Sequence, residues 1–311
     1  MIDAATKAFF HTLAQSALLK RLASKYGMAA NRSFARRFIA GESIEEAIVA
    51  VEAIQAQGFL LTLDYLGESV ATLDEADAAT REYLRILDVI AGSGIERNVS
   101  LKLTQLGLDV DRATCVDNLR RILEPAQRHG FFVRIDMENT LYTEVTLDIF
   151  ETLWQQQYRN VGVVLQSCLY RSEADARRVT ALGARIRLVK GAYKEPKSVA
   201  WRQKAEVDAA YIRIMRYLLD DGTYPAIATH DPAIIDATLD YARARGIAAD
   251  QFELQMLYGV RRDLQRSLAG AGYRMRVYVP FGQQWFPYFM RRLGERPANV
   301  GFVLKSLLRE A

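Results

Sequence analysis

The chain has 311 residues, of which half are hydrophobic and a quarter are charged. This composition is that of a globular protein with a large core, and the length fits one large domain or two medium ones. A net charge of +4 without any run of five basic residues argues against nucleic-acid binding and favours small anionic ligands.

The lack of a recognisable targeting signal and the spacing of the two cysteines favour a cytoplasmic protein. No apolar run approaches the roughly 20 residues that span a bilayer, and the N-terminus has no signal-peptide pattern. Cys115 and Cys168 have neither metal-ligand spacing nor the density of a disulfide framework, so we expect reduced thiols and no bound metal.

The first 57 residues are predicted to form helices. The run SIEEAIVAVEAIQAQG begins with a capping box at Ser43 and Glu46 and ends at Gly58. We expect residues 1–57 to be a helical arm packed on a single catalytic unit formed by residues 58–311.

From residue 58 onward, short β-rich runs alternate with stretches of helical periodicity. The eight runs are FLLTLDYLG, VSLKLTQLG, FFVRIDMEN, VGVVLQSC, RIRLVKGAY, PAIATHD, FELQMLYG and RMRVYVPFG. Helical stretches such as DPAIIDATLDYARARG end in a basic residue followed by glycine, which is typical of a helix C-terminus. Eight strand–helix units in a chain of this size predict an α/β protein with a (β/α)8 barrel.

Polar residues interrupt the predicted strands at their C-terminal ends, where barrels of this class carry their active sites. They are Asp64, Glu68, Lys102, Asp136, Glu138, Gln166, Arg187, Lys190, Thr229, His230, Gln255 and Tyr278. A buried parallel strand is expected to be continuously apolar, and an unpaired buried charge is costly. We therefore predict a functional site at this end of the barrel.

Each of these residues also has a purely structural explanation. Arg187 and Asp136 could form an ion pair inside the barrel, and His230 alone would be read as a hydrogen-bonded core residue. Lys102 could extend its ammonium group to the barrel mouth. The coincidence of many such residues at one rim favours a site.

The C-terminal run YFMRRLGERPANV adds further cations. On a helix, Tyr288, Arg291, Arg292 and Glu295 share one face, although this spacing normally marks an apolar stripe. Together with Lys102, Arg187 and Lys190, the arginines suit an anionic ligand such as a carboxylate or a phosphate.

Three chemical roles fit these residue types. Lys102 or Lys190 could form a Schiff base, as in an aldolase or a lyase. Alternatively, the cationic rim could hold an organic redox cofactor and a carboxylate substrate. A non-catalytic carboxylate-binding barrel is the third possibility.

Six motifs in the same order resemble the proline dehydrogenase family. They are RIDMEN, VVLQ, RLVKGAY, ATHD, FELQMLYG and YFMRRLGE, within a match from LTLDYLGES to ERPANVGFV. The size is similar to that of the bacterial monofunctional enzymes and leaves no room for an aldehyde dehydrogenase domain. The resemblance implies a distorted (β/α)8 barrel that binds FAD non-covalently, with the last helix over the barrel mouth.

The resemblance also implies an activity and its partners. L-proline would be oxidised to Δ1-pyrroline-5-carboxylate, and electrons would pass from the reduced flavin to a membrane quinone. A pyrroline-5-carboxylate dehydrogenase would act downstream as a separate chain. We expect a cytoplasmic enzyme in peripheral contact with the inner face of the membrane, with the helix AFFHTLAQSALLKRLASKYG either docking there or covering the barrel.

The roles of individual residues are carried over by matching positions in these motifs. Asp136 and Arg187 correspond to catalytic residues beside the flavin. The implied substrate contacts are Lys102, Arg291 and Arg292 for the carboxylate, Tyr278, Tyr288 and Leu257 for the ring, and Glu68 as a partner of Arg291. The implied cofactor contacts are Met137, Gln166, Val189, Lys190, Gly191, Ala192, Lys204, Thr229 and His230, with Glu295 directed to the cofactor or to a cation.

Overall fold

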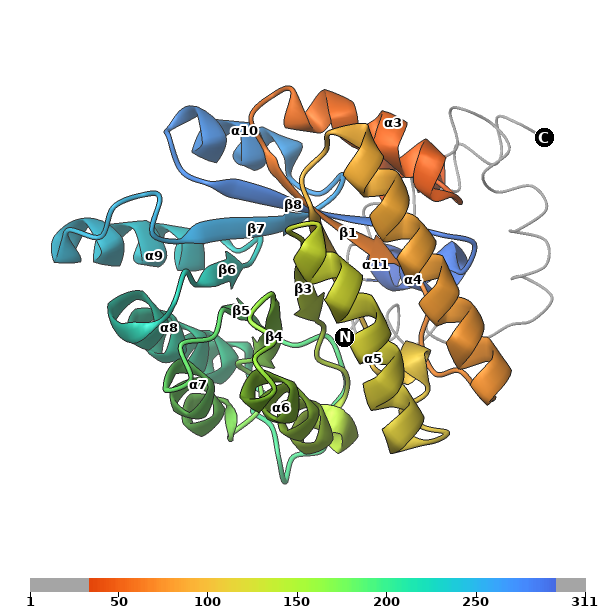
Figure 1. Ribbon diagram of the computed structural model, residues 1–311. Helices are drawn as coiled ribbons and strands as arrows, with labels where there is room; N and C mark the ends of the chain where they lie inside the picture. Colours follow the sequence, from red (N-terminus) through yellow and green to blue (C-terminus); the bar gives the residue numbers. More distant parts are fainter. Residues whose placement is uncertain (1–33, 295–311) are drawn as a thin grey trace.

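Eight parallel strands close into a barrel in the computed structural model, which describes residues 34–294 (Figure 1). The strands are β1 Leu60–Tyr65, β2 Asn98–Leu101, β3 Phe132–Ile135, β4 Val161–Gln166, β5 Ile186–Val189, β6 Ala226–Ala228, β7 Glu253–Leu257 and β8 Met275–Phe281. They follow chain order around the barrel, and β8 pairs with β1 over six residues to close it. The predicted (β/α)8 fold is confirmed.

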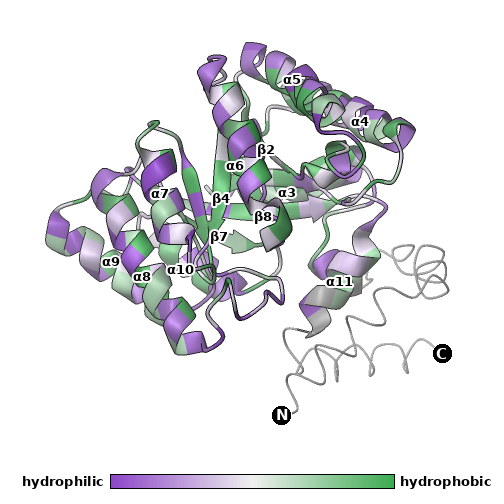
Figure 2. Cartoon of the chain, turned by 90° about the horizontal axis from the view of Figure 1, so that it is seen from below, coloured by the Kyte–Doolittle hydropathy of each residue, from purple (hydrophilic) through white to green (hydrophobic). Residues whose placement is uncertain are grey.

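Helices surround the barrel and follow the strands in sequence. They are α3 Ile44–Gln55, α4 Leu73–Ser93, α5 Arg112–Arg128, α6 Thr140–Gln155, α7 Ser172–Thr180, α8 Lys204–Asp221, α9 Pro232–Arg245, α10 Arg262–Gly270 and α11 Trp285–Gly294, with the 3-10 helices η1 Phe34–Arg37 and η2 Thr104–Leu106. Figure 2 shows that the helices are amphipathic, with green strands between them. Among the helices of residues 34–294, none combines the length and hydropathy that crossing a bilayer requires.

Local sequence signals explain where the helices begin and end. The side chains of Thr72 and Asp111 accept hydrogen bonds from backbone N–H groups in the first turns of α4 and α5. Helix α9 begins with Asp231 as its cap and Pro232 in its first turn, and it ends at Gly246 with a φ of 67°. These ends turn the chain back toward the next strand.

The described part of the N-terminal arm packs on the barrel. Helix α3 contacts α4, β1 and β8, and the Ala40 N–H donates to the Pro280 carbonyl at 2.9 Å. The predicted capping box is half formed, because Ser43 accepts from the Glu46 N–H while the Glu46 carboxylate accepts from the Glu42 N–H. Residues 1–33 lie outside the described residues, so the extent of the arm stays a prediction.

Charged side chains also fill the lower part of the barrel, which is the end formed by the N-terminal ends of the strands, opposite the predicted site. Arg276 on β8 donates from Nε and Nη2 to the two carboxylate oxygens of Glu253 on β7, both at 2.9 Å. Its Nη1 donates to Glu96 at 2.6 Å. Burial by itself would raise the pKa of Glu253, but Arg276 outweighs burial and lowers that pKa. Because both side chains are almost fully buried, their pairing is a condition for this part of the barrel to form.

Replacing Glu253 with glutamine should destabilise the fold by about 3 kcal/mol or more, because Arg276 then keeps its buried charge without this partner. The free energy of unfolding from urea denaturation measures the loss. Glu82→Gln, on the exposed surface of α4, is the matched control and should cost less than about 1 kcal/mol. Equal losses for the two variants would contradict the role given to the buried pair.

Candidate active site

The centre of the barrel mouth is a carboxylate clamped between two donors. Asp136 follows β3, and its Oδ1 accepts from Arg187 Nη1 on β5 at 2.7 Å while its Oδ2 accepts from the Tyr278 hydroxyl on β8 at 2.7 Å. The Arg187 guanidinium lies 5.2 Å from the centre of the Tyr278 ring. Each carboxylate oxygen accepts one hydrogen bond, so Asp136 fixes the positions of its two neighbours.

The Arg187 side chain is fixed from a second direction. Its Nη2 donates to Ser100 Oγ on β2 at 3.1 Å, and its side chain is only 5% exposed. Burial and the charge of Asp136 raise the pKa of Tyr278 well above its ordinary value, so its hydroxyl keeps its proton. The mouth therefore presents a fixed positive charge and an un-ionised phenol.

A second ion pair lies beside the first. Lys102 follows β2, and its Nζ is 3.6 Å from Oδ1 of Asp64 near the end of β1. The sequence marks Asp64 as a strand-end residue, but the resemblance assigns no role to it. The inward direction of Asp64 and its distance from Lys102 become known only from the barrel register, in which Asp64 lies opposite Ser100.

Two of the predicted cofactor residues meet at a pair of aspartates. Lys190, after β5, is 2.7 Å from Asp231 and 2.5 Å from Asp208. Lys204, at the start of α8, is 2.8 Å from Asp231 and also pairs with Asp208. Hydrogen bonds from the two lysines lower the pKa of Asp231 to about 2. Sequence reasoning missed both aspartates because one caps a helix and the other lies on a helix surface.

Other predicted residues are held by backbone contacts. Gln166 donates from Nε2 to the Glu138 carbonyl at 2.8 Å, and His230 accepts from the Leu257 N–H through Nε2 at 2.9 Å. Thr229 Oγ1 accepts from the Asp231 N–H at 3.1 Å. The remaining ones follow strand ends: Met137 is buried, Val189 is half-buried, and Ala192 is exposed.

Gly191 lies where a side chain would not fit. Its φ is 109°, and a Cβ at this position would come within 2.4 Å of Cys168 Sγ and 3.3 Å of Gln166 Oε1. The conformation favours glycine, and the close neighbours exclude any larger residue. The chain at Gly191 therefore packs against Cys168 and Gln166 more closely than a residue with a side chain could.

Helix α11 brings the aromatic part of the last motif to the barrel. Tyr288 is buried in a cluster with Phe38, Leu66, Trp285 and other apolar residues. The Arg292 guanidinium lies 5.2 Å from the centre of the Tyr288 ring. The side chain of Arg291 and the whole of Glu295 lie outside the described residues, so the partner predicted for the half-buried Glu68 is not tested.

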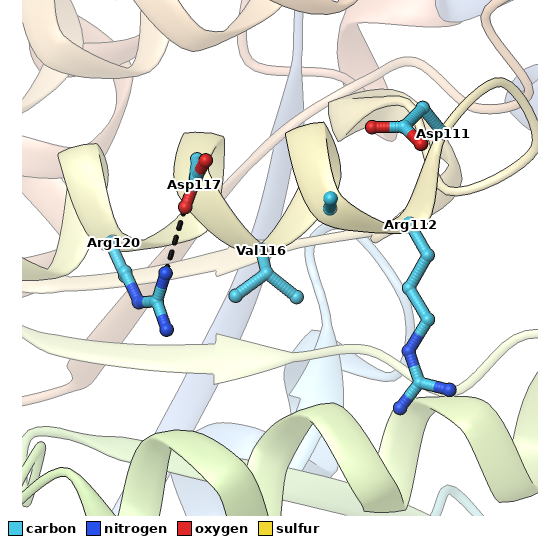
Figure 3. A pocket seen from close by; sticks show the side chains of 6 residues that line it. Asp111, Arg112, Val116, Asp117 and Arg120 are labelled. Atoms are coloured by element: carbon cyan, nitrogen blue, oxygen red, sulfur yellow. Dashed lines mark hydrogen bonds and ion pairs between the residues drawn. The ribbon is translucent and has the colours of Figure 1, made fainter.

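A surface hollow of about 530 Å³ lies on the first turns of α5, facing α6 (Figure 3). Its lining residues are Asp111, Arg112, Ala113, Val116, Asp117 and Arg120. Arg120 pairs with Asp117 at 2.7 Å, and Asp111 caps the helix. These groups satisfy one another and none comes from a strand end, so we place the active site at the barrel mouth instead.

The fold and this geometry define a (β/α)8 barrel whose mouth gathers buried cations, as a site for a small anionic ligand requires. The model of the proline dehydrogenase family matches residues 47–305, and the chain belongs to this family.

Relatives agree with this assignment. The chain is 42% identical to proline dehydrogenase 2 of Bacillus subtilis (strain 168), over 98% of this chain and 99% of that protein. It is 43% identical to the proline dehydrogenase of Deinococcus radiodurans, over 89% of this chain and 91% of the relative.

A solved structure shares the fold. It is proline utilization A (PutA) from Bdellovibrio bacteriovorus inactivated by N-propargylglycine, with a TM-score of 0.76 and 29% identity over 83% of this chain. The chain covers 32% of that longer protein.

Substituting Gly191 with alanine should destabilise the protein more than Gly183→Ala does. Both glycines have a positive φ, but nothing lies within 4 Å of a Cβ at Gly183. We expect roughly 1–2 kcal/mol of backbone strain for Gly183→Ala and a larger loss for Gly191→Ala. Cys168→Ala in the Gly191→Ala background should recover part of the excess, measured as the free energy of unfolding. No recovery would refute the steric explanation.

Proposed function

We propose that this chain oxidises L-proline to Δ1-pyrroline-5-carboxylate with non-covalently bound FAD and passes the electrons to a membrane quinone. The clamp of Asp136 between Arg187 and Tyr278, at the mouth of a barrel of the proline dehydrogenase family, carries the proposal. A fixed guanidinium of this kind suits a cofactor whose reduced form is negatively charged.

The residues at the mouth fit a flavin nucleotide. The exposed Gly191 carries no side chain that would obstruct a flat ring system. The ammonium groups of Lys190 and Lys204 lie beside the N-terminus of α9, where a diphosphate is favoured. The residues that would hold FAD are Met137, Gln166, Val189, Lys190, Gly191, Ala192, Lys204, Thr229 and His230. Bound there, FAD would supply the hydride acceptor.

The chain's own residues would bind the substrate by its carboxylate. Lys102 and Arg292 would take this role, with Arg291 as the third cation implied by the family resemblance. Tyr278, Tyr288 and Leu257 would surround the ring and exclude water. Arg187 would stabilise negative charge on the acceptor side, and Asp136 would keep Arg187 and Tyr278 in place instead of taking a proton.

The Schiff-base alternative is disfavoured by the ion pairs. Burial by itself would lower the pKa of Lys102, but Asp64 and other nearby charges raise it above its ordinary value. A lysine that stays protonated is a poor nucleophile. Lys190 is engaged in ion pairs with two carboxylates, those of Asp208 and Asp231.

The quinone, a peripheral contact with the inner face of the cytoplasmic membrane, and a separate pyrroline-5-carboxylate dehydrogenase complete the proposal. They are supported by family membership. The chain matches 99% of proline dehydrogenase 2 of Bacillus subtilis but only 24% of the bifunctional protein PutA of Escherichia coli (strain K12).

The purified protein should be yellow and should lose its visible flavin absorption when L-proline is added without oxygen. Acid precipitation should release intact FAD into the supernatant, because the cofactor is not covalently attached. D-proline, with its carboxylate on the wrong side of the ring, is the control for specific bleaching. A colourless protein that borohydride traps covalently with a carbonyl substrate would instead support the lyase.

Replacing Arg292 with methionine should raise the proline KM roughly 10- to 100-fold, as expected for losing one charge-assisted hydrogen bond. The kcat should change less, because the hydride acceptor is untouched. Steady-state kinetics with a dye acceptor give both constants. Arg266→Met, on the exposed surface of α10, is the matched control, and an unchanged KM in Arg292→Met would refute the assignment.

A further inference from the structure

Asp64 is a buried carboxyl group to which the preceding sections give no function. Its side chain is 1% exposed at the C-terminal end of β1, within the barrel mouth. Neither of its oxygens has a hydrogen-bond partner, and its ion pair is with Lys102, whose Nζ lies 3.6 Å from Oδ1. A buried carboxylate without a hydrogen bond is costly, so this residue calls for an explanation.

Asp64 and Asp136, which both lie at the barrel mouth, differ in how their carboxylates are bound. Asp136 accepts two hydrogen bonds at 2.7 Å and is saturated. Asp64 has Lys102 as its nearest cation, at the longer distance of 3.6 Å, and Arg187 acts on it more weakly. The contact between Asp64 and Lys102 is therefore longer than either of the two hydrogen bonds that hold Asp136.

Lys102 needs such a partner because of its own surroundings. Its side chain is only 12% exposed, and burial by itself favours the neutral amine. A neutral Lys102 would bind a carboxylate weakly. The nearest charge that can keep it protonated is Asp64.

We propose that Asp64 is a positioning residue that holds Lys102 at the barrel mouth in its charged form, ready for the carboxylate of the substrate. The inference rests on the proposed function, since it deepens the role given there to Lys102. When the substrate carboxylate binds, Lys102 Nζ shares its protons between the two carboxylates, and no covalent bond changes.

Other charged groups around Lys102 are weaker partners. Burial lowers its pKa most, and Asp64 is the largest opposing influence, followed by Asp136 after β3, Tyr193 after β5 and Glu68 after β1. Of these, Asp136 is already bound to Arg187 and Tyr278. Removing the charge of Asp64 should therefore let burial dominate and lower the pKa of Lys102, so carboxylate binding would be lost at a lower pH.

The test is to measure by calorimetry how tightly cyclopentanecarboxylate binds to the FAD-loaded protein between about pH 6 and pH 10. This is the range in which a lysine moved by its surroundings titrates. This probe has the ring and carboxylate of proline but no amine, so its own charge is constant. In Asp64→Asn, affinity near pH 6 should equal or exceed that of the wild type, because one negative charge beside the ligand is gone. Toward the alkaline end, the pH at which affinity begins to fall should be about 1–3 units lower than in the wild type, since removing a charge at this distance moves a pKa by about 1–3 units.

Two variants serve as controls. Asp64→Glu keeps the charge and should restore the wild-type pH profile. Glu138→Gln removes another buried carboxylate near the mouth, one that accepts from the Thr104 N–H at 3.2 Å and from Thr104 Oγ1 at 2.6 Å. It should lower the alkaline limit less than Asp64→Asn does, because the charge of Glu138 acts on Lys102 more weakly than that of Asp64.

A pH profile of Asp64→Asn that matches the wild type would overturn the inference and leave the proposed function standing. Absence of binding to the wild-type protein would instead overturn the carboxylate site itself. If Asp64→Asn does not fold, Lys102→Gln is compared with Lys102→Gln/Asp64→Asn, which removes both charges of the pair. The double variant should bind the probe more tightly than Lys102→Gln, and equal or weaker binding would overturn the inference.

Discussion

The burial of charge inside a closed barrel is the constraint on which the rest of this structure depends. A (β/α)8 barrel is usually filled by branched apolar side chains, whereas this one encloses Arg134, Glu253, Arg276, Arg187 and Asp136. Arg187 and Arg276 find carboxylate partners across the interior, whereas Arg134 donates to the backbone carbonyls of Val163 and Arg185. Strand order and register thus decide which charges are neutralised.

Two levels of ion pairs result, and they differ in what they can do. The lower level, from Arg276 to Glu253 and Glu96, lies at the N-terminal ends of the strands, away from the candidate site, and contributes to the fold. The upper level lies at the C-terminal strand ends, where Arg187 pairs with Asp136 and Lys102 with Asp64. A buried pair is weak evidence for stability, so its retention at a barrel mouth is better explained by function.

Much of this could be predicted from the sequence because polar residues interrupt otherwise apolar strands. The rim residues Lys102, Asp136, Arg187 and Tyr278 follow from those interruptions, and the eight strands and the fold class follow from the alternation of β-rich and helical runs. Of the ion pairs, the sequence suggests that of Arg187 with Asp136, whereas those of Lys102 with Asp64 and of Lys190 with Asp231 depend on how the strands and the segments after them meet in space. Arg276 and Glu253 are not predicted, because they lie at the opposite ends of their strands from the predicted site.

A residue that serves both the fold and the site is hard to predict for a different reason. Asp231 is recognisable in the sequence as a helix cap before Pro232, and that role alone explains its presence. The structure shows that the same carboxylate also receives Lys190 and Lys204. A cap satisfies only part of a carboxylate's hydrogen-bonding capacity, so a capping residue at the barrel mouth can serve the fold and the site together.

Formal charge assigns different tasks to the barrel and to α11. Lys102 with Asp64, and Arg187 with Asp136, carry no net charge in their ion pairs. Under the proposed function, these two pairs would orient the substrate without attracting it from a distance, while Arg291, Arg292 and Glu68 would sum to a single positive charge that matches the carboxylate of proline. The barrel would then supply fixed geometry, and the last helix would supply the charge that draws the substrate in.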